Sequence, residues 1–177
     1  MKNRKEEQHF IKDIGLVKTV INDLFVLNNI NSCVIVEFGF GTGSFTKCLM
    51  DLKFIYKGYE FDKNLRIDFI KNFIKQDRYT KLNDGSIYYK NMFFEFKEFP
   101  YVEYSEVIHI SAPPYSELKK YSDNIHKSNG KYVLLVGEKY LSLFNEYDIL
   151  LELSGNDFEP KSKGQHFLIT NINKGSF

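Results

Sequence analysis

The stretch Cys33-Val-Ile-Val-Glu37-Phe-Gly39-Phe-Gly41-Thr-Gly43-Ser-Phe-Thr46 decides the fold. Its apolar start, residues 33–38, predicts a buried strand, and the three alternating glycines predict a sharp turn into a helix from about residue 43. In open α/β sheets ligands bind at such a turn, beyond the carboxyl end of a strand. The spacing is Gly-x-Gly-x-Gly, whereas dinucleotide-binding loops need Gly-x-Gly-x-x-Gly, and Ser44 stands where their last glycine lies.

Short apolar runs alternate with helical patterns on both sides of this loop. Helices are expected at 10–28, from 43, at 63–74, 116–126 and 138–144, and strands at 33–38, 54–60, 86–90, 106–111 and 132–136. This order predicts five parallel strands with helices on both faces. Two more runs, 147–153 and 166–170, have no helix between them and should form an antiparallel hairpin at the sheet edge. The resulting Rossmann-like α/β sheet of seven strands resembles that of class I methyltransferases.

The second predicted strand ends in an acid. Glu60 lies 21 residues after Gly39 (60 − 39), where a carboxylate can accept hydrogen bonds from both hydroxyls of a ribose. Together with the glycine loop, this predicts a nucleoside cofactor. A nicotinamide dinucleotide and a purely structural turn with a solvated acid remain alternatives.

Composition limits the partners of the chain. Its 177 residues, 43% of them hydrophobic, suit one domain, and the net charge of +1 provides no overall attraction to nucleic acid. No apolar run approaches the ~20 residues that span a bilayer, and the first seven residues lack the apolar core expected of a signal peptide. Cys33 and Cys48 suggest buried thiols. We expect a cytoplasmic or otherwise reducing location, no membrane partner and no metal.

Several stretches carry a resemblance to a known family. They are Gln8-His-Phe-Ile-Lys-Asp13, Glu37-Phe-Gly-Phe-Gly-Thr-Gly-Ser-Phe-Thr46 and Glu60-Phe-Asp-Lys-Asn-Leu65. In order and spacing they resemble the segments Q-N/H-F-L-x-D, E-x-G-x-G-x-G-x-L-T and E-x-D-x-x-L of the ribosomal RNA adenine N6-dimethyltransferases, which include the erythromycin-resistance methylases. The later stretches 136–139 and 158–161 resemble the family's Q-K-E and F-x-P-x-P-K more weakly.

The resemblance implies S-adenosylmethionine as cofactor. Residues 1–30 would form a helical lid over it and residues 31–177 the catalytic core, giving a single methyltransferase domain without the family's separate RNA-binding helical domain. The family has an acid that holds the cofactor adenine after the third strand, where Asn91 would be a neutral substitute. The implied cofactor contacts are Gln8, His9, Glu37, Gly39, Gly41, Glu60, Phe61, Asn91 and Met92.

The family's catalytic N-L/I-P-Y segment corresponds to Ser111-Ala112-Pro113-Pro114-Tyr115. In the family the Asn amide and a neighbouring carbonyl accept hydrogen bonds from the target amino group, while the aromatic ring stacks on an extruded base. Tyr115 keeps the ring, but Ala112 has no acceptor, and Ser111 can replace it only if the loop is shifted by one residue. The alternative is that these prolines merely stiffen a turn.

The sequence thus predicts methyl transfer to the N6 amino group of adenine in RNA, most simply ribosomal RNA, with a second protein subunit as a possible partner. A second reading is a non-catalytic protein that keeps the fold and binds RNA or a protein. Both Ala112 and Asn91 favour this reading. A third reading is methylation of another planar amide or amine in a protein or small molecule.

Overall fold

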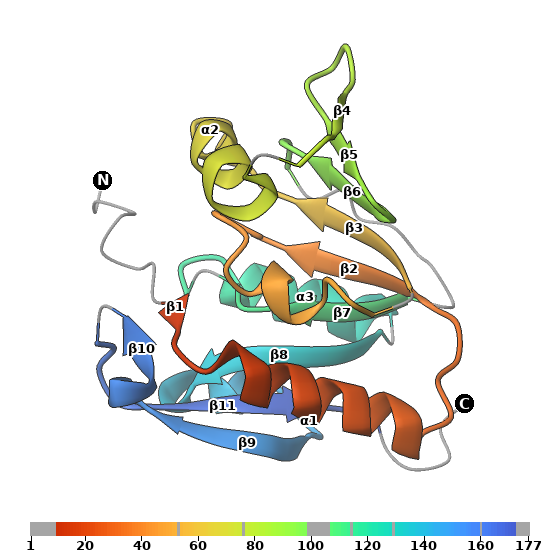
Figure 1. The fold of residues 1–177 in the computed structure, drawn as a ribbon. Coiled ribbons are helices and arrows are strands. Elements are labelled where there is room, and N and C mark those ends of the chain that lie inside the picture. The colour runs from red at the N-terminus through yellow and green to blue at the C-terminus, as the bar shows by residue number, and fades with distance from the viewer. Residues whose placement is uncertain are drawn as a thin grey trace.

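The computed structural model describes residues 10–52, 54–75, 77–98, 107–113, 115–128, 130–159 and 161–172. Its centre is a nine-stranded sheet in the order β4-β5-β6-β3-β2-β7-β8-β11-β9 (Figure 1). The strands are β2 Val34–Phe38, β3 Ile55–Tyr59, β4 Thr80–Lys81, β5 Ile87–Tyr89, β6 Met92–Glu95, β7 Val107–Ser111, β8 Lys131–Gly137, β9 Asp148–Ser154 and β11 Gln165–Thr170.

The predicted seven strands form the larger part of this sheet. Strands β6, β3, β2, β7 and β8 are parallel neighbours. Strand β11 then pairs antiparallel with β8, and β9 pairs antiparallel with β11 at the edge. The terminal hairpin and four of the five predicted parallel strands are therefore confirmed in place, and the sheet does contain five parallel strands.

The other edge of the sheet differs from the prediction, because two short strands, β4 and β5, extend it. The run expected at 86–90 is β5, which is antiparallel to β6, and the third parallel strand is β6 itself. Lys90 and Asn91 form the tight turn between them, with Lys90 in a left-handed conformation at φ 56°. A hairpin this short cannot be separated from one continuous apolar strand by periodicity alone.

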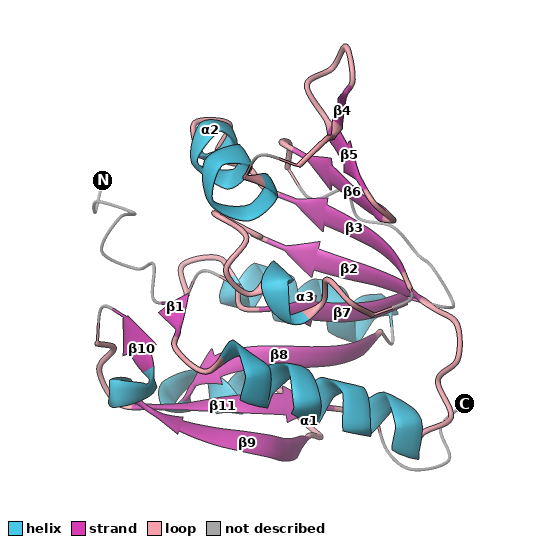
Figure 2. Ribbon diagram, in the orientation of Figure 1, coloured by secondary structure: helices cyan, strands magenta, loops and turns pink. Residues whose placement is uncertain are grey.

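Helices cover both faces of the sheet (Figure 2). They are α1 Ile14–Leu27, α2 Leu65–Phe69 with a π-helical continuation Ile70–Ile74, and α3 Leu118–Ser128. Two expected helices are wrong in type: the one from residue 43 is a 3₁₀ turn at Thr46–Cys48, and the one at 138–144 is a 3₁₀ helix at Glu138–Leu143. A 3₁₀ turn, Gly155–Asp157, and a small sheet pairing β1 (Phe10–Ile11) with β10 (Phe158–Glu159) complete the fold.

Helix α1 belongs to the core of the domain. The Asp13 carboxylate caps its start by accepting from the Leu16 amide at 2.8 Å. Val17 and Ile21 are fully buried one turn apart and pack in the larger of the two main hydrophobic clusters. The helix therefore fixes one face of the sheet, although it falls within the 1–30 segment expected to act as a lid.

An aromatic cluster fills the space under α2. Phe69 stacks on Phe73 with ring centroids 5.0 Å apart, and Phe94 contacts both rings at 4.6 Å and 5.5 Å. Phe40, from the glycine loop, adds a further contact with Phe69 at 4.7 Å. This packing ties the loop to the sheet. Within the described ranges, no helix has the length and apolar character needed to cross a bilayer.

Candidate active site

The glycine loop needs glycines for its backbone conformation. Gly39, Gly41 and Gly43 all have positive φ, at 69°, 56° and 82°, in the region that side chains disfavour. The Gly39 amide donates to the Tyr59 carbonyl at 2.7 Å, which ties the loop to the end of β3. The loop thus turns sharply at the carboxyl end of β2, as expected.

Glu60 follows β3 and meets this loop. Its Oε2 accepts from the Gly41 amide at 2.9 Å, and its Oε1 accepts from the Asp62 amide at 2.8 Å. The residue is 8% exposed. A carboxylate has about four acceptor positions, so this side chain has the chemistry to accept hydrogen bonds from ribose hydroxyls.

Glu37 lies at the end of β2 and is almost fully buried. Its Oε2 accepts from the Thr46 hydroxyl at 2.8 Å and from the Tyr56 hydroxyl at 2.5 Å. Burial raises the pKa of this carboxyl to about 7, although both hydrogen bonds oppose the shift. Glu37 is thus a buried acid that titrates near neutral pH.

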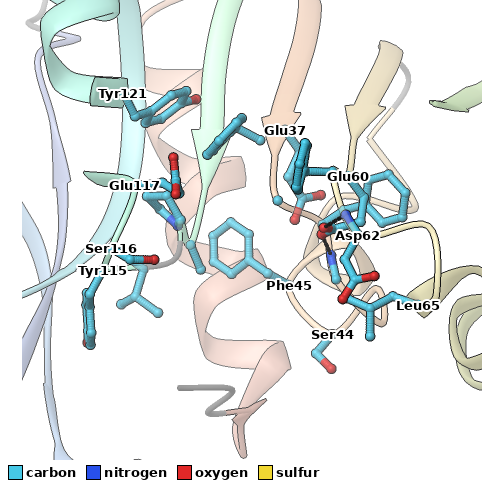
Figure 3. A pocket seen from close by; sticks show the side chains of 18 of the residues that line it. Glu37, Ser44, Phe45, Glu60, Asp62, Leu65, Tyr115, Ser116, Glu117 and Tyr121 are labelled. Atoms are coloured by element: carbon cyan, nitrogen blue, oxygen red, sulfur yellow. Dashed lines mark hydrogen bonds between the residues drawn. The ribbon is translucent and has the colours of Figure 1, made fainter. Parts of the chain in front are cut away.

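A cavity of about 400 Å³ opens between the glycine loop and α3, and its size suits a small-molecule site. Figure 3 shows Glu37 and Glu60 on one side of it, with Tyr115, Ser116 and Glu117 on the other. Eight of the residues expected at the site line this cavity: Glu37, Gly39, Gly41, Glu60, Phe61, Ala112, Pro113 and Tyr115. The expected residues Gln8, His9 and Pro114 lie outside the described residues.

The expected cofactor contacts Asn91 and Met92 are wrong. Both lie at the amino end of β6, and neither lines the cavity at the carboxyl ends of the strands. The Asn91 amide donates to the Phe54 carbonyl, and Met92 is 1% exposed in the core. The physical reason is the hairpin at Lys90 and Asn91, which starts the third parallel strand later than periodicity indicated.

The acid that lines the cavity beyond β6 is Glu98. Its carboxylate accepts from the Lys120 ammonium at 2.7 Å, and this contact lowers the pKa of Glu98 and raises that of Lys120. Sequence reasoning missed Glu98 because the strand before it was displaced.

Helix α3 and the last hairpin also supply residues that the sequence did not suggest. The cavity-lining residues from α3 and the turn before it are Ser116, Glu117, Lys120, Tyr121 and Asn124, and the hairpin adds Phe158 and His166. Positions 117, 120, 121 and 124 are spaced by three and four, so they share one face of a helix. That spacing, next to the Pro-Pro-Tyr turn, is the signal that could have indicated the α3 residues.

Ser111, an expected catalytic residue, has a structural role at the end of β7. It is fully buried at the end of β7, and it is absent from the cavity lining. Its hydroxyl accepts from the Phe38 amide at 2.7 Å and donates to the Phe38 carbonyl at 3.1 Å. Ser111 therefore joins β7 to the end of β2 and does not reach a substrate.

We expect Ser111→Ala to lower the free energy of unfolding by about 1–3 kcal/mol, because the Phe38 amide loses its acceptor in a buried position. Ser122→Ala is the matched control: Ser122 is also buried, but its hydroxyl only donates to the Lys119 carbonyl of its own helix. Urea denaturation of both variants measures the difference. Equal losses would contradict the bridging role of Ser111.

Tyr115 lies at the border of the cavity, beside the last hairpin. Its hydroxyl is 2.7 Å from Nδ1 of His166, and its ring stacks on Tyr140 with centroids 4.9 Å apart. The Lys139 ammonium lies 4.8 Å from the centre of the Tyr140 ring. One face of the Tyr115 ring is therefore covered by Tyr140, so any base must use another part of this aromatic group.

The cavity is acidic. Its titratable lining includes the Lys120 ammonium, which is paired with Glu98, and five carboxylic acids: Glu37, Glu60, Asp62, Glu98 and Glu117. Such a lining attracts cations and disfavours phosphates. Among the described residues, no group of three or more His, Cys, Asp or Glu side chains is arranged to hold a metal ion.

The sheet order, the glycine loop and the acid beyond β3 together define the class I methyltransferase fold. The structure is similar to a dimethyladenosine transferase from Plasmodium falciparum, with a TM-score of 0.62 and 14% identity over 91% of this chain and 62% of that one. It is also similar to the 23S rRNA methyltransferase ErmE, with a TM-score of 0.65 and 13% identity over 91% of this chain and 68% of that one. At identities this low, the structural similarity shows the fold alone.

At the level of sequence, the chain resembles a ribosomal RNA small subunit methyltransferase A from Mycoplasma genitalium. The two are 37% identical over 97 residues, which cover 52% of this chain and 35% of that protein. The alignment thus spans about a third of the length of that relative. No family model matches the chain. The predicted resemblance to ribosomal RNA adenine methyltransferases is confirmed.

Proposed function

We propose that the chain is an S-adenosylmethionine-dependent methyltransferase that acts on the N6 amino group of adenine in RNA. The observation that carries the proposal is the contact between Glu60 and the Gly41 amide, which sets a ribose-binding carboxylate beside an open backbone turn inside an acidic cavity. The names of the similar proteins, a ribosomal RNA methyltransferase and a dimethyladenosine transferase, support ribosomal RNA as the substrate class.

The charge of the cavity supports this cofactor over a nicotinamide dinucleotide. S-adenosylmethionine carries a sulfonium and an ammonium group, which suit a lining rich in carboxylates. A dinucleotide brings a pyrophosphate, which usually needs the amide groups at the start of a helix. Here the glycine loop leads only into the three-residue 3₁₀ turn Thr46–Cys48.

In this proposal Glu60 binds the ribose hydroxyls, and the backbone of Gly39 and Gly41 allows close approach of the cofactor. Phe61, which is 59% exposed at the cavity rim, contributes an apolar contact, and Glu98 takes the role of the adenine-binding acid. When bound, S-adenosylmethionine supplies an electrophilic methyl group. The wall formed by Ala112, Pro113 and Tyr115 holds the target base and keeps water away from its amino group.

Calorimetry with S-adenosylmethionine tests the cofactor assignment. We expect Glu60→Gln to weaken binding by about 10- to 100-fold, because charge-assisted hydrogen bonds to the ribose are lost. Asp68→Asn is the matched control, because Asp68 is an exposed carboxylate on α2 that does not line the cavity. Binding of NAD in its place, or no nucleoside binding at all, would overturn the proposal.

A non-catalytic binding protein is the second candidate. Ala112 has no side-chain acceptor, and the Ser111 hydroxyl is committed to the Phe38 backbone, so the family's catalytic amide has no replacement within residues 111 and 112. Incubation of the wild-type chain with methyl-labelled S-adenosylmethionine and ribosomal RNA separates the two candidates. Cofactor binding without label on any adenine would favour the non-catalytic one.

A further inference from the structure

The cavity lacks the amide that orients the target amino group in similar enzymes, and the inference below rests on the proposed function. A nucleophilic amino group needs a hydrogen-bond acceptor that holds it in line and a group that takes its proton. Ala112 offers neither, and Ser111 is buried away from the cavity. An acceptor must therefore come from another part of the same wall.

Glu117 is the carboxylate on that wall. It lies two residues after Tyr115 in the turn that leads into α3, and its carbonyl accepts from the Tyr121 amide at 3.0 Å, which fixes its backbone to the helix. Glu117 is half-buried and lines the cavity together with Ala112 and Tyr115. In Figure 3 it lies across the cavity from Glu60, with Phe45 between them.

The Glu117 carboxylate is available to a ligand. Across the described ranges no hydrogen bond or ion pair engages it. The Lys120 ammonium, three residues along the chain, is bonded to Glu98 at 2.7 Å, and the Glu117 charge contributes to the raised pKa of Lys120. Asn124 also lines the cavity, but it lies seven residues further along the chain, about 10 Å along a helix at 1.5 Å per residue. Glu117 is thus the acceptor beside the wall that holds the base.

We propose that Glu117 replaces the missing amide as the residue that accepts a hydrogen bond from the target amino group and takes its proton. The amino nitrogen forms a bond to the methyl carbon as the carbon–sulfur bond breaks, and the electron pair of that bond stays on sulfur. The nitrogen then carries one proton too many, and this proton passes to the Glu117 carboxylate. Charge and atoms balance, because a sulfonium and a carboxylate become a thioether and a carboxylic acid.

Two substitutions at one position test this role. Ribosomal RNA and methyl-labelled S-adenosylmethionine are the substrates, label on adenine is the rate readout, and calorimetry gives cofactor affinity. We expect Glu117→Ala to lower the rate about 100-fold or more, because both acceptor and base are lost. Glu117→Gln keeps an acceptor, so its rate should lie between those of Glu117→Ala and wild type. The cofactor affinity of both variants should stay within about twofold of the wild-type value.

Rescue and control variants separate this role from a structural one. The double variant Glu117→Ala with Ala112→Asn should be about tenfold or more faster than Glu117→Ala alone, because an amide acceptor is restored at its position in the family. Asp123→Asn removes the same charge from an exposed site of the same helix and should leave the rate unchanged.

The outcomes distinguish this proposal from the proposed function. If wild type labels adenine and Glu117→Ala does so equally fast, only the role of Glu117 is overturned. A loss of cofactor affinity as large as the loss of rate would overturn it too, since the carboxylate would then belong to the cofactor site. If wild type binds the cofactor but labels no RNA, the proposed function fails and the role of Glu117 fails with it.

Discussion

Glu37 is expected to contribute a loss of stability of about 2.5 kcal/mol between pH 5 and pH 8, and replacing it with Gln should remove that contribution. The carboxyl has a pKa of about 7 in the folded chain, above its ordinary value of 4.5. On raising the pH, the unfolded chain releases this proton first. The folded chain binds more protons between these values, so its free energy of unfolding falls as the pH rises and the contribution is lost above about pH 7.

The groups around Glu37 do not titrate in this interval. Burial raises the pKa of Tyr56 well above 10 and that of Cys48 to about 12, so both stay protonated. Glu60, the other acid in the network, raises the pKa of Glu37 by repulsion. Elsewhere in the domain, burial lowers the pKa of His109 from 6.5 to about 4, so its contribution to stability rises with pH. The contribution of Glu37 is therefore the difference between wild type and Glu37→Gln.

Urea denaturation at pH 5 and pH 8 checks this expectation. Between pH 5 and pH 8 the unfolding free energy of Glu37→Gln should rise by about 2.5 kcal/mol relative to that of wild type. Glu152→Gln is the control, because Glu152 is exposed on β9 and its replacement should keep the wild-type pH dependence. A Glu37→Gln variant whose unfolding free energy changes with pH just as that of wild type does would contradict the raised pKa.

The sequence was sufficient to bring Glu60 and the glycine loop together, because both follow adjacent parallel strands. A strand, a glycine turn and an acid 21 residues after Gly39 (60 − 39) lie on adjacent parallel strands, so their carboxyl ends meet at one edge of the sheet. The positive φ values of the glycines and the contact of Glu60 with Gly41 follow from that arrangement. The same reasoning gave the five parallel strands and the terminal hairpin.

At other positions the pattern of apolar residues was ambiguous, or the interacting residues lie far apart in the sequence. Two short apolar runs, 87–89 and 92–94, are separated only by the turn at Lys90 and Asn91. This turn makes them two strands, which displaced the expected contacts Asn91 and Met92. The role of Ser111 depends on Phe38, 73 residues earlier in the chain. His166 reaches the site because β11 pairs with β8, and no spacing rule could have linked it to Tyr115.

Gly43→Ala should destabilise the fold by about 3 kcal/mol, because a left-handed conformation and a steric clash act together. Its φ is 82°, and an added Cβ would lie 2.7 Å from Cδ2 and 2.8 Å from Cβ of Phe73. The Phe73 ring cannot easily move away, since it packs between Phe69 and Phe94 in the aromatic cluster. The clash involves the base of that side chain as well as its ring.

Gly164→Ala separates the two contributions. Gly164 has the same φ of 82°, but an added Cβ would have no atom within 4 Å, so this variant carries the backbone strain alone, about 1–2 kcal/mol. Urea denaturation measures the loss of unfolding free energy in each variant. The difference between the two losses is the energy of the clash with Phe73. Equal losses would mean that the Phe73 side chain moves aside without an energetic cost. A larger loss for Gly43→Ala means that the glycine loop and the aromatic cluster are one rigid unit, which holds the Gly41 amide against Glu60 before any ligand binds.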